Sequence, residues 1–141
     1  MRAQFSDPLN IQLGARSLDA FAAFGTRPGH EIDFRRVGYL FLLSRPEDVA
    51  TFEQSIELQN RLGVPSRLID PAEARRLSPP VDTDGLLAAA FSPDDGLATP
   101  EAVVHGYAAG ARRHGAHVET GCELLEGRVA GEEITAVVTS K

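Results

Sequence analysis

The sequence has one cysteine, no tryptophan and no long apolar run. Cys122 has no partner for an internal disulfide, and no group of cysteine and histidine has the spacing of a metal site. We therefore expect no bound metal and a reducing, cytoplasmic location. The longest apolar run, residues 39–43, is far shorter than the roughly 20 residues that cross a bilayer. No basic segment followed by an apolar run opens the chain, so we expect neither export nor a membrane partner.

Positive charge and catalytic motifs are scarce as well. Lysine and arginine total 14 against 20 aspartate and glutamate, for a net charge of −6, and the arginine pairs are scattered along the chain. Such a surface repels phosphate backbones, so nucleic acid is not expected as a partner. The sequence contains no nucleophile elbow, phosphate loop or glycine fingerprint for a dinucleotide. The residues alone therefore indicate no catalytic constellation.

Two acidic stretches and a histidine pair need a choice between two interpretations. Residues 82–85 and 94–96 are acidic and end in glycine, but neither has the further ligands of a calcium loop, so we interpret both as turns. His114 and His117 flank Gly115 and do not share a helix face, which favours a helix end over a metal site.

Apolar periodicity predicts four helices, at about residues 7–24, 46–62, from 71 to before Pro79, and 100–114. Their expected starts carry capping signals. Ser44 with Glu47 has the form of a capping box, and Asp70 and Thr99 each precede a proline. Gly115 is expected to end the last helix in a left-handed conformation.

Strands are expected between these helices. Residues 38–43 are apolar on both faces, which is typical of a strand inside a sheet covered on both sides. Further strands are expected at the following positions: 32–34, 64–69, 86–91, 116–119, and two or three between 122 and 140, divided at 126–127 and 131–132. The predicted fold class is α+β, with a mixed, largely antiparallel sheet flanked by helices.

The order of several short motifs resembles the FAD-dependent D-amino-acid oxidase family, in particular its sarcosine oxidase beta-subunit and glycine oxidase branch. The similarity extends over nearly the whole chain. The segments that carry it are Arg2–Ser6, Phe34–Leu40, Leu62–Val64, Asp70–Ala74, Leu77–Pro79, Asp95–Gly96 with Pro100, and Gly115–Ala116.

The resemblance implies a division of the chain and a cofactor. Residues 1–30 would be an N-terminal helix and linker, residues 31–97 strands and helices of the substrate domain, and residues 98–141 a helix and β-meander of the flavin domain. It implies a truncated piece of an FAD-dependent oxidoreductase that oxidises an amino acid by hydride transfer from the α carbon to the flavin. Because the glycine turn that holds the pyrophosphate is missing, we expect no FAD bound to this chain alone.

Site residues follow from the resemblance for four positions. Arg2 matches the family arginine near the flavin and, in some members, the substrate carboxylate; at a chain terminus we expect it to be disordered. Leu124 falls where backbone groups meet the adenine. Tyr39 and Phe91 are candidates for the roof of the substrate pocket, with ordinary core packing as the alternative for each. The catalytic residues and the main carboxylate-binding residues are expected beyond Lys141 and stay unknown.

The resemblance implies a small amino acid as substrate, and the isolated piece is expected to be inactive. The alternative is a free-standing α+β binding or interaction domain without redox activity. We also expect a homo-oligomer to form through apolar surfaces that truncation exposes in the C-terminal third, with Val103, Val104 and Tyr107 among the exposed residues.

Overall fold

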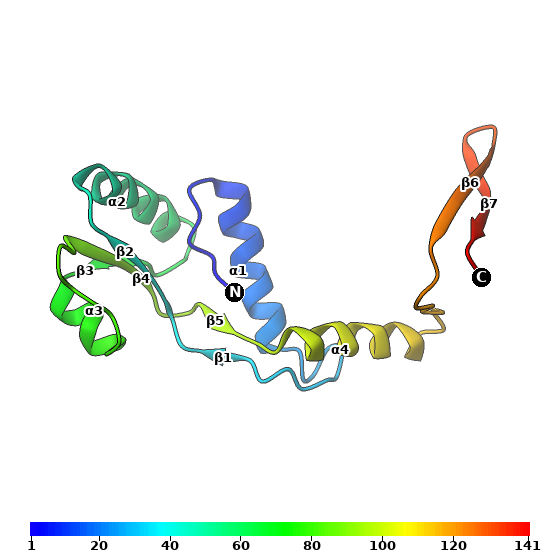
Figure 1. Cartoon of the computed structure of the whole chain (residues 1–141), viewed down its shortest axis with the longest axis horizontal. Helices are drawn as coiled ribbons and strands as arrows, with labels where there is room; N and C mark the ends of the chain where they lie inside the picture. Colours follow the sequence, from blue (N-terminus) through cyan, green and yellow to red (C-terminus); the bar gives the residue numbers. More distant parts are fainter. The chain divides into compact units, whose positions relative to one another are not determined.

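A computed structural model describes residues 1–141 (Figure 1). The chain forms two compact units, Met1–Gly106 and Tyr107–Lys141. None of the helices combines the length and the apolar character needed to cross a membrane.

The first unit is built on a three-stranded antiparallel sheet. Its strands are β2 (Tyr39–Leu43), β3 (Arg67–Ile69) and β4 (Ala88–Ser92), in the order β2-β4-β3. These are the strands expected at 38–43, 64–69 and 86–91. The α+β class with an antiparallel sheet is therefore confirmed.

The position of β2 in this sheet differs from the expectation. The strand lies at an edge, and Tyr39 and Leu42 are 40% and 47% exposed. The middle strand is β4, where Ala89 and Ala90 are 0% and 1% exposed. Small side chains let elements on both faces approach a strand closely. The run of alanine on β4 therefore suits the centre of the sheet, and the bulkier Tyr39 and Phe41 lie on the edge strand β2.

One helix covers each face of the sheet. On the first face, α2 (Pro46–Arg61) contributes Ile56, which packs with Leu43 and Ala90. On the second face, α3 (Pro71–Leu77) contributes Ala74, which packs with Ile69 and Ala89. Alternate residues of each strand point to opposite faces, so the two groups form separate cores.

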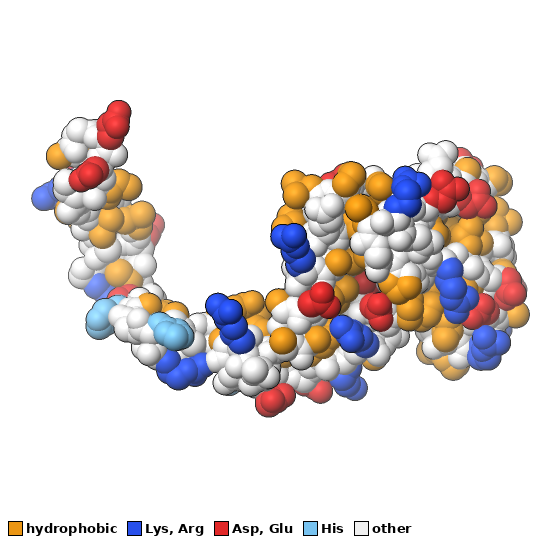
Figure 2. All heavy atoms as spheres, turned by 180° about the vertical axis from the view of Figure 1, so that it is seen from behind, with side chains coloured by type: hydrophobic (Ala, Val, Ile, Leu, Met, Phe, Trp, Pro, Cys, Tyr) orange, Lys and Arg blue, Asp and Glu red, His pale blue; other side chains and the backbone are white.

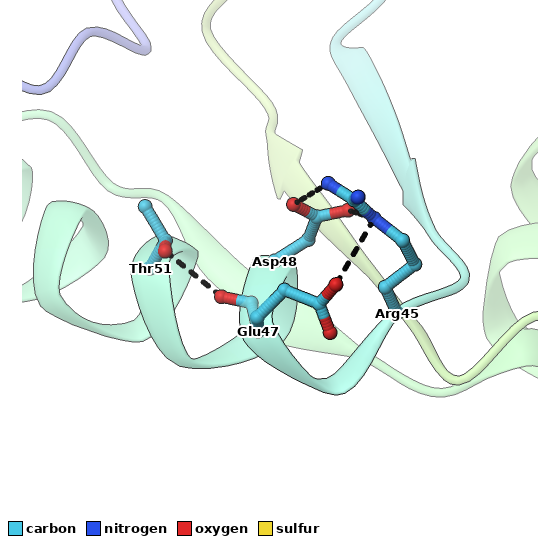
Figure 3. A network of polar contacts seen from close by, with 4 residues as sticks. All are labelled: Arg45, Glu47, Asp48 and Thr51. Carbon is cyan, nitrogen blue, oxygen red and sulfur yellow. Dashed lines mark hydrogen bonds and ion pairs between the residues drawn. The ribbon is translucent and has the colours of Figure 1, made fainter.

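The start of α2 corrects the expected capping box. Arg45, not Ser44, occupies the N-cap position, and no side chain caps the helix there. This shift of one residue moves Glu47 out of reach of the reciprocal bond. Instead, the Arg45 guanidinium donates to both oxygens of Asp48, each at 2.8 Å (Figure 3). At α3 the expected cap is confirmed, because Asp70 Oδ1 accepts the Glu73 N–H at 2.7 Å.

Helix α1 (Pro8–Ala22) lies beside α2 (Figure 1). Its Ile11 and Leu18 form a third core with Ala3 and Val64. Near it, a short antiparallel pair joins β1 (Arg35–Arg36) to β5 (Gly96–Leu97). The strand expected at 32–34 therefore begins later, where backbone pairing with β5 is available.

Helix α4 (Pro100–Arg113) begins in the first unit and ends in the second. Gly106 lets it pack closely in the first unit, since a Cβ atom there would lie 2.9 Å from His30 Cβ. The helix ends as expected at Gly115, whose φ is +86°. The Ala116 N–H donates to the Ala111 carbonyl at 3.1 Å, which is the hydrogen bond between the sixth and first residues of a Schellman motif.

The rest of the second unit is a hairpin of β6 (Leu124–Ala130) and β7 (Glu133–Thr139). The expected turn at 131–132 is confirmed. The division expected at 126–127 is wrong, because β6 continues through these residues, and its register shifts lie between Leu124 and Glu126 and between Arg128 and Val129. The strand expected at 116–119 is wrong, because β6 and β7 pair only with each other and leave that segment without a partner. Apolar side chains lie on the hairpin surface (Figure 2).

Candidate functional site

The residue with the clearest capacity to bind a ligand is Arg2. Its guanidinium carbon lies 4.8 Å from the ring centre of Phe5, 4.9 Å from that of Phe41 and 5.9 Å from that of Tyr39. Aromatic faces attract a cation at such distances. The side chain is half-buried, and Nη1 donates to the Gln4 carbonyl at 2.9 Å. The expectation that Arg2 is disordered is therefore wrong, because neighbouring rings and a backbone carbonyl hold it.

Arg2 has no carboxylate partner among the ion pairs of the chain. A second arginine shows the contrast. Arg67 lies 5.5 Å from the Phe91 ring centre, but its guanidinium donates to Glu73 at 2.7 and 3.1 Å. This bonding lowers the pKa of the Glu73 carboxyl. Arg67 is thus paired with a carboxylate at contact distance, whereas Arg2 makes no ion pair and interacts with the Asp95 carboxyl only at longer range, so its N–H donors are available to an anion.

The surroundings of Arg2 form a hollow of about 260 Å³ between the start of the chain, β2 and α2. Tyr39, Phe41 and Phe52 form a continuous aromatic row, with 5.1 Å between successive ring centres. Polar groups complete the wall. Besides Arg2, the hollow is lined by Gln4, Phe5, Ser6, Phe41, Thr51, Phe52, Ser55 and Gln59.

The two predicted pocket residues point to opposite faces of the sheet. Tyr39 lies beside Phe41 on the face that α2 covers, whereas Phe91 pairs with Leu40 and packs on the face that α3 covers. Both nevertheless border one hollow of about 300 Å³ at the Gly38 end of β2. Their role as a pocket roof stays a prediction.

Leu124, the other predicted cofactor residue, is the first residue of β6 in the second unit. Its side chain is 65% exposed. Arg2 belongs to the first unit. The role of Leu124 at an adenine therefore also stays a prediction.

Sequence reasoning missed three buried polar side chains near Arg2, namely Gln4, Gln59 and Asp95. They are 3%, 1% and 0% exposed. For Gln59 a signal existed, because it continues the buried stripe of Phe52 and Ile56 at helical spacing. For Asp95 the sequence indicates only a turn, and nothing in the local pattern distinguishes it from its exposed neighbour Asp94.

The Asp95 carboxyl is the titratable group that burial affects most clearly. Oδ1 accepts the Ala3 N–H at 2.9 Å. Burial raises the pKa of the carboxyl, and the bond from Ala3 opposes part of that rise. The Ser92 hydroxyl is near enough to lower the pKa as well, although Ser92 Oγ and Asp95 Oδ2 do not meet in good hydrogen-bond geometry.

FAD, the cofactor that the resemblance implies, fits these residues only in part. Its pyrophosphate is normally held by backbone N–H groups at a helix N-terminus that follows a glycine turn. All four helices here begin with proline, and carboxylates of Asp7 and Asp70 already accept the N–H groups that open α1 and α3. The helix ends therefore do not fit the pyrophosphate. Arg2, an uncompensated cation, fits an anionic or electron-rich group of a cofactor or substrate.

Comparison with known proteins supports the resemblance. Residues 1–141 match the family model described as DAO, FAD dependent oxidoreductase. A stretch of 110 residues is 33% identical to the anaerobic glycerol-3-phosphate dehydrogenase subunit A1 of Haloferax volcanii, covering 77% of this chain and 18% of that protein. A stretch of 99 residues is 26% identical to mitochondrial dimethylglycine dehydrogenase of Rattus norvegicus, covering 70% of this chain and 12% of that protein.

A solved structure shares the fold over almost the whole chain. The crystal structure of L-proline dehydrogenase from P. horikoshii matches with a TM-score of 0.92 and 35% sequence identity, over 99% of this chain and 37% of that one. The chain thus spans less than a fifth of the two curated relatives and little more than a third of the solved one. Because the family model matches every residue, the chain belongs to the DAO family of FAD-dependent oxidoreductases.

Proposed function

We propose that these 141 residues work as part of a longer FAD-dependent oxidoreductase that oxidises an amino acid at the bond between its α carbon and its nitrogen. The substrate would be of the sarcosine, glycine or D-amino-acid type, or a cyclic amino acid. The names of two relatives support this class, since one is an L-proline dehydrogenase and the other a dimethylglycine dehydrogenase.

The observation that carries the proposal is the uncompensated guanidinium of Arg2 over an aromatic wall. A guanidinium binds a carboxylate through two parallel N–H donors, and every amino-acid substrate brings a carboxylate. The rings keep the cation in place before the ligand arrives, which reduces the entropy that binding would cost. In this proposal Arg2 faces the flavin and contacts the substrate carboxylate.

The other predicted residues have supporting roles. Tyr39 and Phe91 line the substrate pocket. The hollow at the Gly38 end of β2, which both residues border, supports this role. The backbone of Leu124 meets the adenine, and the exposure of this residue leaves it accessible. When bound, the flavin supplies the acceptor for the hydride of the α carbon. The residues of this chain hold the carboxylate, orient the α carbon and exclude water.

A second candidate is oxidation of glycerol 3-phosphate, which the 33% identity to the Haloferax volcanii subunit favours. Arg2 would then bind a phosphate instead of a carboxylate.

Anaerobic mixing of the FAD-loaded complete protein with single substrates separates the two candidates. L-proline, sarcosine, dimethylglycine, glycine, D-alanine and glycerol 3-phosphate would each be tested for bleaching of the flavin absorbance. We expect bleaching by at least one amino acid and none by glycerol 3-phosphate. Bleaching by glycerol 3-phosphate alone would contradict the proposal.

Substitution of Arg2 tests its part in the proposal. We expect Arg2→Ala to raise the concentration of the active amino acid at half-maximal rate by about tenfold or more, as for loss of a charge-assisted hydrogen bond. Arg16→Ala is the matched control, because Arg16 is exposed on α1. An equal effect of the two substitutions would remove Arg2 from the site.

A further inference from the structure

Residues 1–5, here called the N-terminal segment, belong to no helix or strand, yet they are fixed at several points. The Ala3 N–H donates to Asp95 Oδ1 at 2.9 Å, and the Gly96 N–H donates to the Met1 carbonyl at 3.0 Å. On the other side, Gln59 Nε2 donates to the Phe5 carbonyl at 2.9 Å. Arg2 lies between these attachment points.

Helix α1 confines the same segment from a further direction. A Cβ atom at Gly14 would lie 2.9 Å from Ala3 Cα and 3.0 Å from the Arg2 carbonyl oxygen. The helix backbone therefore touches the segment backbone directly, and Ala3 is fully buried there. The segment has little freedom to move toward α1.

Burying the side chains of Asp95 and Gln59 costs free energy of folding, so their hydrogen bonds to the N-terminal segment need a reason. Asp95 and Gln59 are at most 1% exposed, and each keeps one oxygen, Oδ2 and Oε1, without a hydrogen-bond partner in the chain. An unpaired buried polar atom opposes folding. A leucine at position 59 would fill the stripe of α2 without that cost. The contribution of the amide is therefore its bond to the Phe5 carbonyl.

We propose that Asp95 and Gln59 are positioning residues for Arg2, holding the backbone that follows it at Ala3 and at Phe5 so that the guanidinium stays over Phe5 and Phe41. This inference rests on the proposed function of Arg2. Asp95 does not line the hollow, and Gln59, which does, is only 1% exposed, so in this arrangement both act through the backbone of the N-terminal segment. A displacement of about 1 Å at a binding group can cost up to roughly a hundredfold in rate or affinity, so a looser segment weakens the site without removing the charge.

The test uses the complete FAD-loaded protein and two readouts. The first is the Kd of acetate, a simple carboxylate probe, measured from the change in flavin absorbance. The second is hydrogen exchange at the amides of residues 2–5, which reports whether the segment stays attached. The variants are Asp95→Ala and Gln59→Leu, each made with and without Arg2→Ala. Asp95→Asn is the conservative variant, because its amide oxygen can still accept the Ala3 N–H.

We expect Asp95→Ala and Gln59→Leu to raise the Kd of acetate by about tenfold and to speed exchange at residues 2–5. Asp95→Asn should stay close to the wild type in both readouts. In the Arg2→Ala background the two substitutions should leave the Kd unchanged, because their effect passes through Arg2.

The outcomes separate the inference from the proposed function. If Asp95→Ala and Gln59→Leu weaken acetate binding equally with and without Arg2, they do not act through Arg2 and the inference is overturned. If they leave both exchange and Kd unchanged while Arg2→Ala weakens binding, the inference is overturned and the function of Arg2 stands. If Arg2→Ala leaves the Kd unchanged, the proposed function of Arg2 is overturned, and faster exchange in the other variants still shows the attachment.

Discussion

Gly38 lies so close to Phe91 that a Cβ atom at Gly38 would overlap the Phe91 ring. The φ of Gly38 is +77°, a left-handed conformation, and its N–H donates to the Asp95 carbonyl at 2.8 Å. The glycine stands directly before β2, and Phe91 lies on the neighbouring strand β4. The hydrogen bond from Gly38 therefore joins the start of the edge strand β2 to the turn that carries Asp95.

The first prediction compares two glycines with nearly the same backbone conformation. Gly85 has a φ of +72°, but a Cβ atom there would meet nothing within 4 Å. An alanine in a left-handed conformation costs about 1–2 kcal/mol, and overpacking adds about 1–3 kcal/mol. We therefore expect Gly38→Ala to lower the free energy of unfolding by roughly 2–5 kcal/mol, and Gly85→Ala by only the roughly 1–2 kcal/mol of the left-handed conformation. Urea denaturation measures both, and equal losses would show that the Phe91 ring yields without cost.

The second prediction concerns pH and Asp95. Its pKa is raised above the ordinary value of 3.8, chiefly by burial. The folded state therefore binds the proton more tightly than the unfolded state, and the resulting stability is present below pH 3.8 and lost as pH rises through the folded pKa. Asp95→Asn has no charge to bury, so we expect it to be more stable than the wild type at pH 7, with a difference that shrinks toward pH 3.5.

Urea midpoints of the wild type and Asp95→Asn at several pH values test this prediction. Asp94→Asn is the matched control, because Asp94 is the exposed neighbour. A wild type that is more stable than Asp95→Asn at pH 7 would mean that the charge is compensated in the folded protein, and the predicted sign would be wrong.

Most of the secondary structure could be predicted from the sequence because periodicity and capping are local. The helix that begins after Asp70 and the helix end at Gly115 depend on residues a few positions apart, and both are confirmed. Helix α2 starts at Pro46 as expected, but its N-cap is Arg45 instead of Ser44, and an ion pair between Arg45 and Asp48 stands where the capping box was expected. Local patterns therefore fix the helices to within about two residues, whereas the strands expected at 32–34 and 64–69 begin three residues later and the one at 116–119 is absent.

The arrangement of the sheet and the site could not be read in the same way. An apolar strand such as residues 39–43 can lie at the centre or at the edge of a sheet. Which of the two it occupies depends on its strand partners, and here β4 is its partner. The separation of Tyr39 and Phe91 onto two faces depends on a cross-strand register that their own neighbours do not set. Gln59 and Phe5 are 54 positions apart, so their hydrogen bond is a property of the fold.

The third prediction concerns association of the 141-residue chain through its hairpin. Ile134 and Val129 are register partners and are 72% and 65% exposed. The outer edges of β6 and β7 are also unpaired, which favours pairing with another copy. We expect sedimentation to show concentration-dependent dimers that Ile134→Lys suppresses. His117→Lys adds the same charge at an exposed position outside the strands and should have no effect. A wild type that stays monomeric at high concentration would contradict this prediction.

The last prediction is that the 141-residue chain does not bind FAD tightly on its own. The largest charge of the cofactor is its pyrophosphate, which needs several N–H donors converging at one point. Here α1 and α3 open with donors already bonded to Asp7 and Asp70, and the first turn of α2 carries Glu47 and Asp48, whose charges repel a phosphate. In the hollow beside Phe41 the cation is Arg2, and one charge-assisted contact contributes only about 1.5–3 kcal/mol.

A titration of FAD fluorescence with the chain tests this, with Arg2→Ala as the comparison. We expect no saturation up to about 100 μM protein, because a Kd of that size already requires about 5.5 kcal/mol, more than Arg2 supplies alone. The Arg2→Ala chain should give the same flat titration. Saturable binding that Arg2→Ala weakens would show that the hollow beside Phe41 holds much more of the cofactor than its single cation suggests. Binding that Arg2→Ala leaves unchanged would place the phosphate donors elsewhere in the chain, and the physical argument from the helix ends would then be wrong.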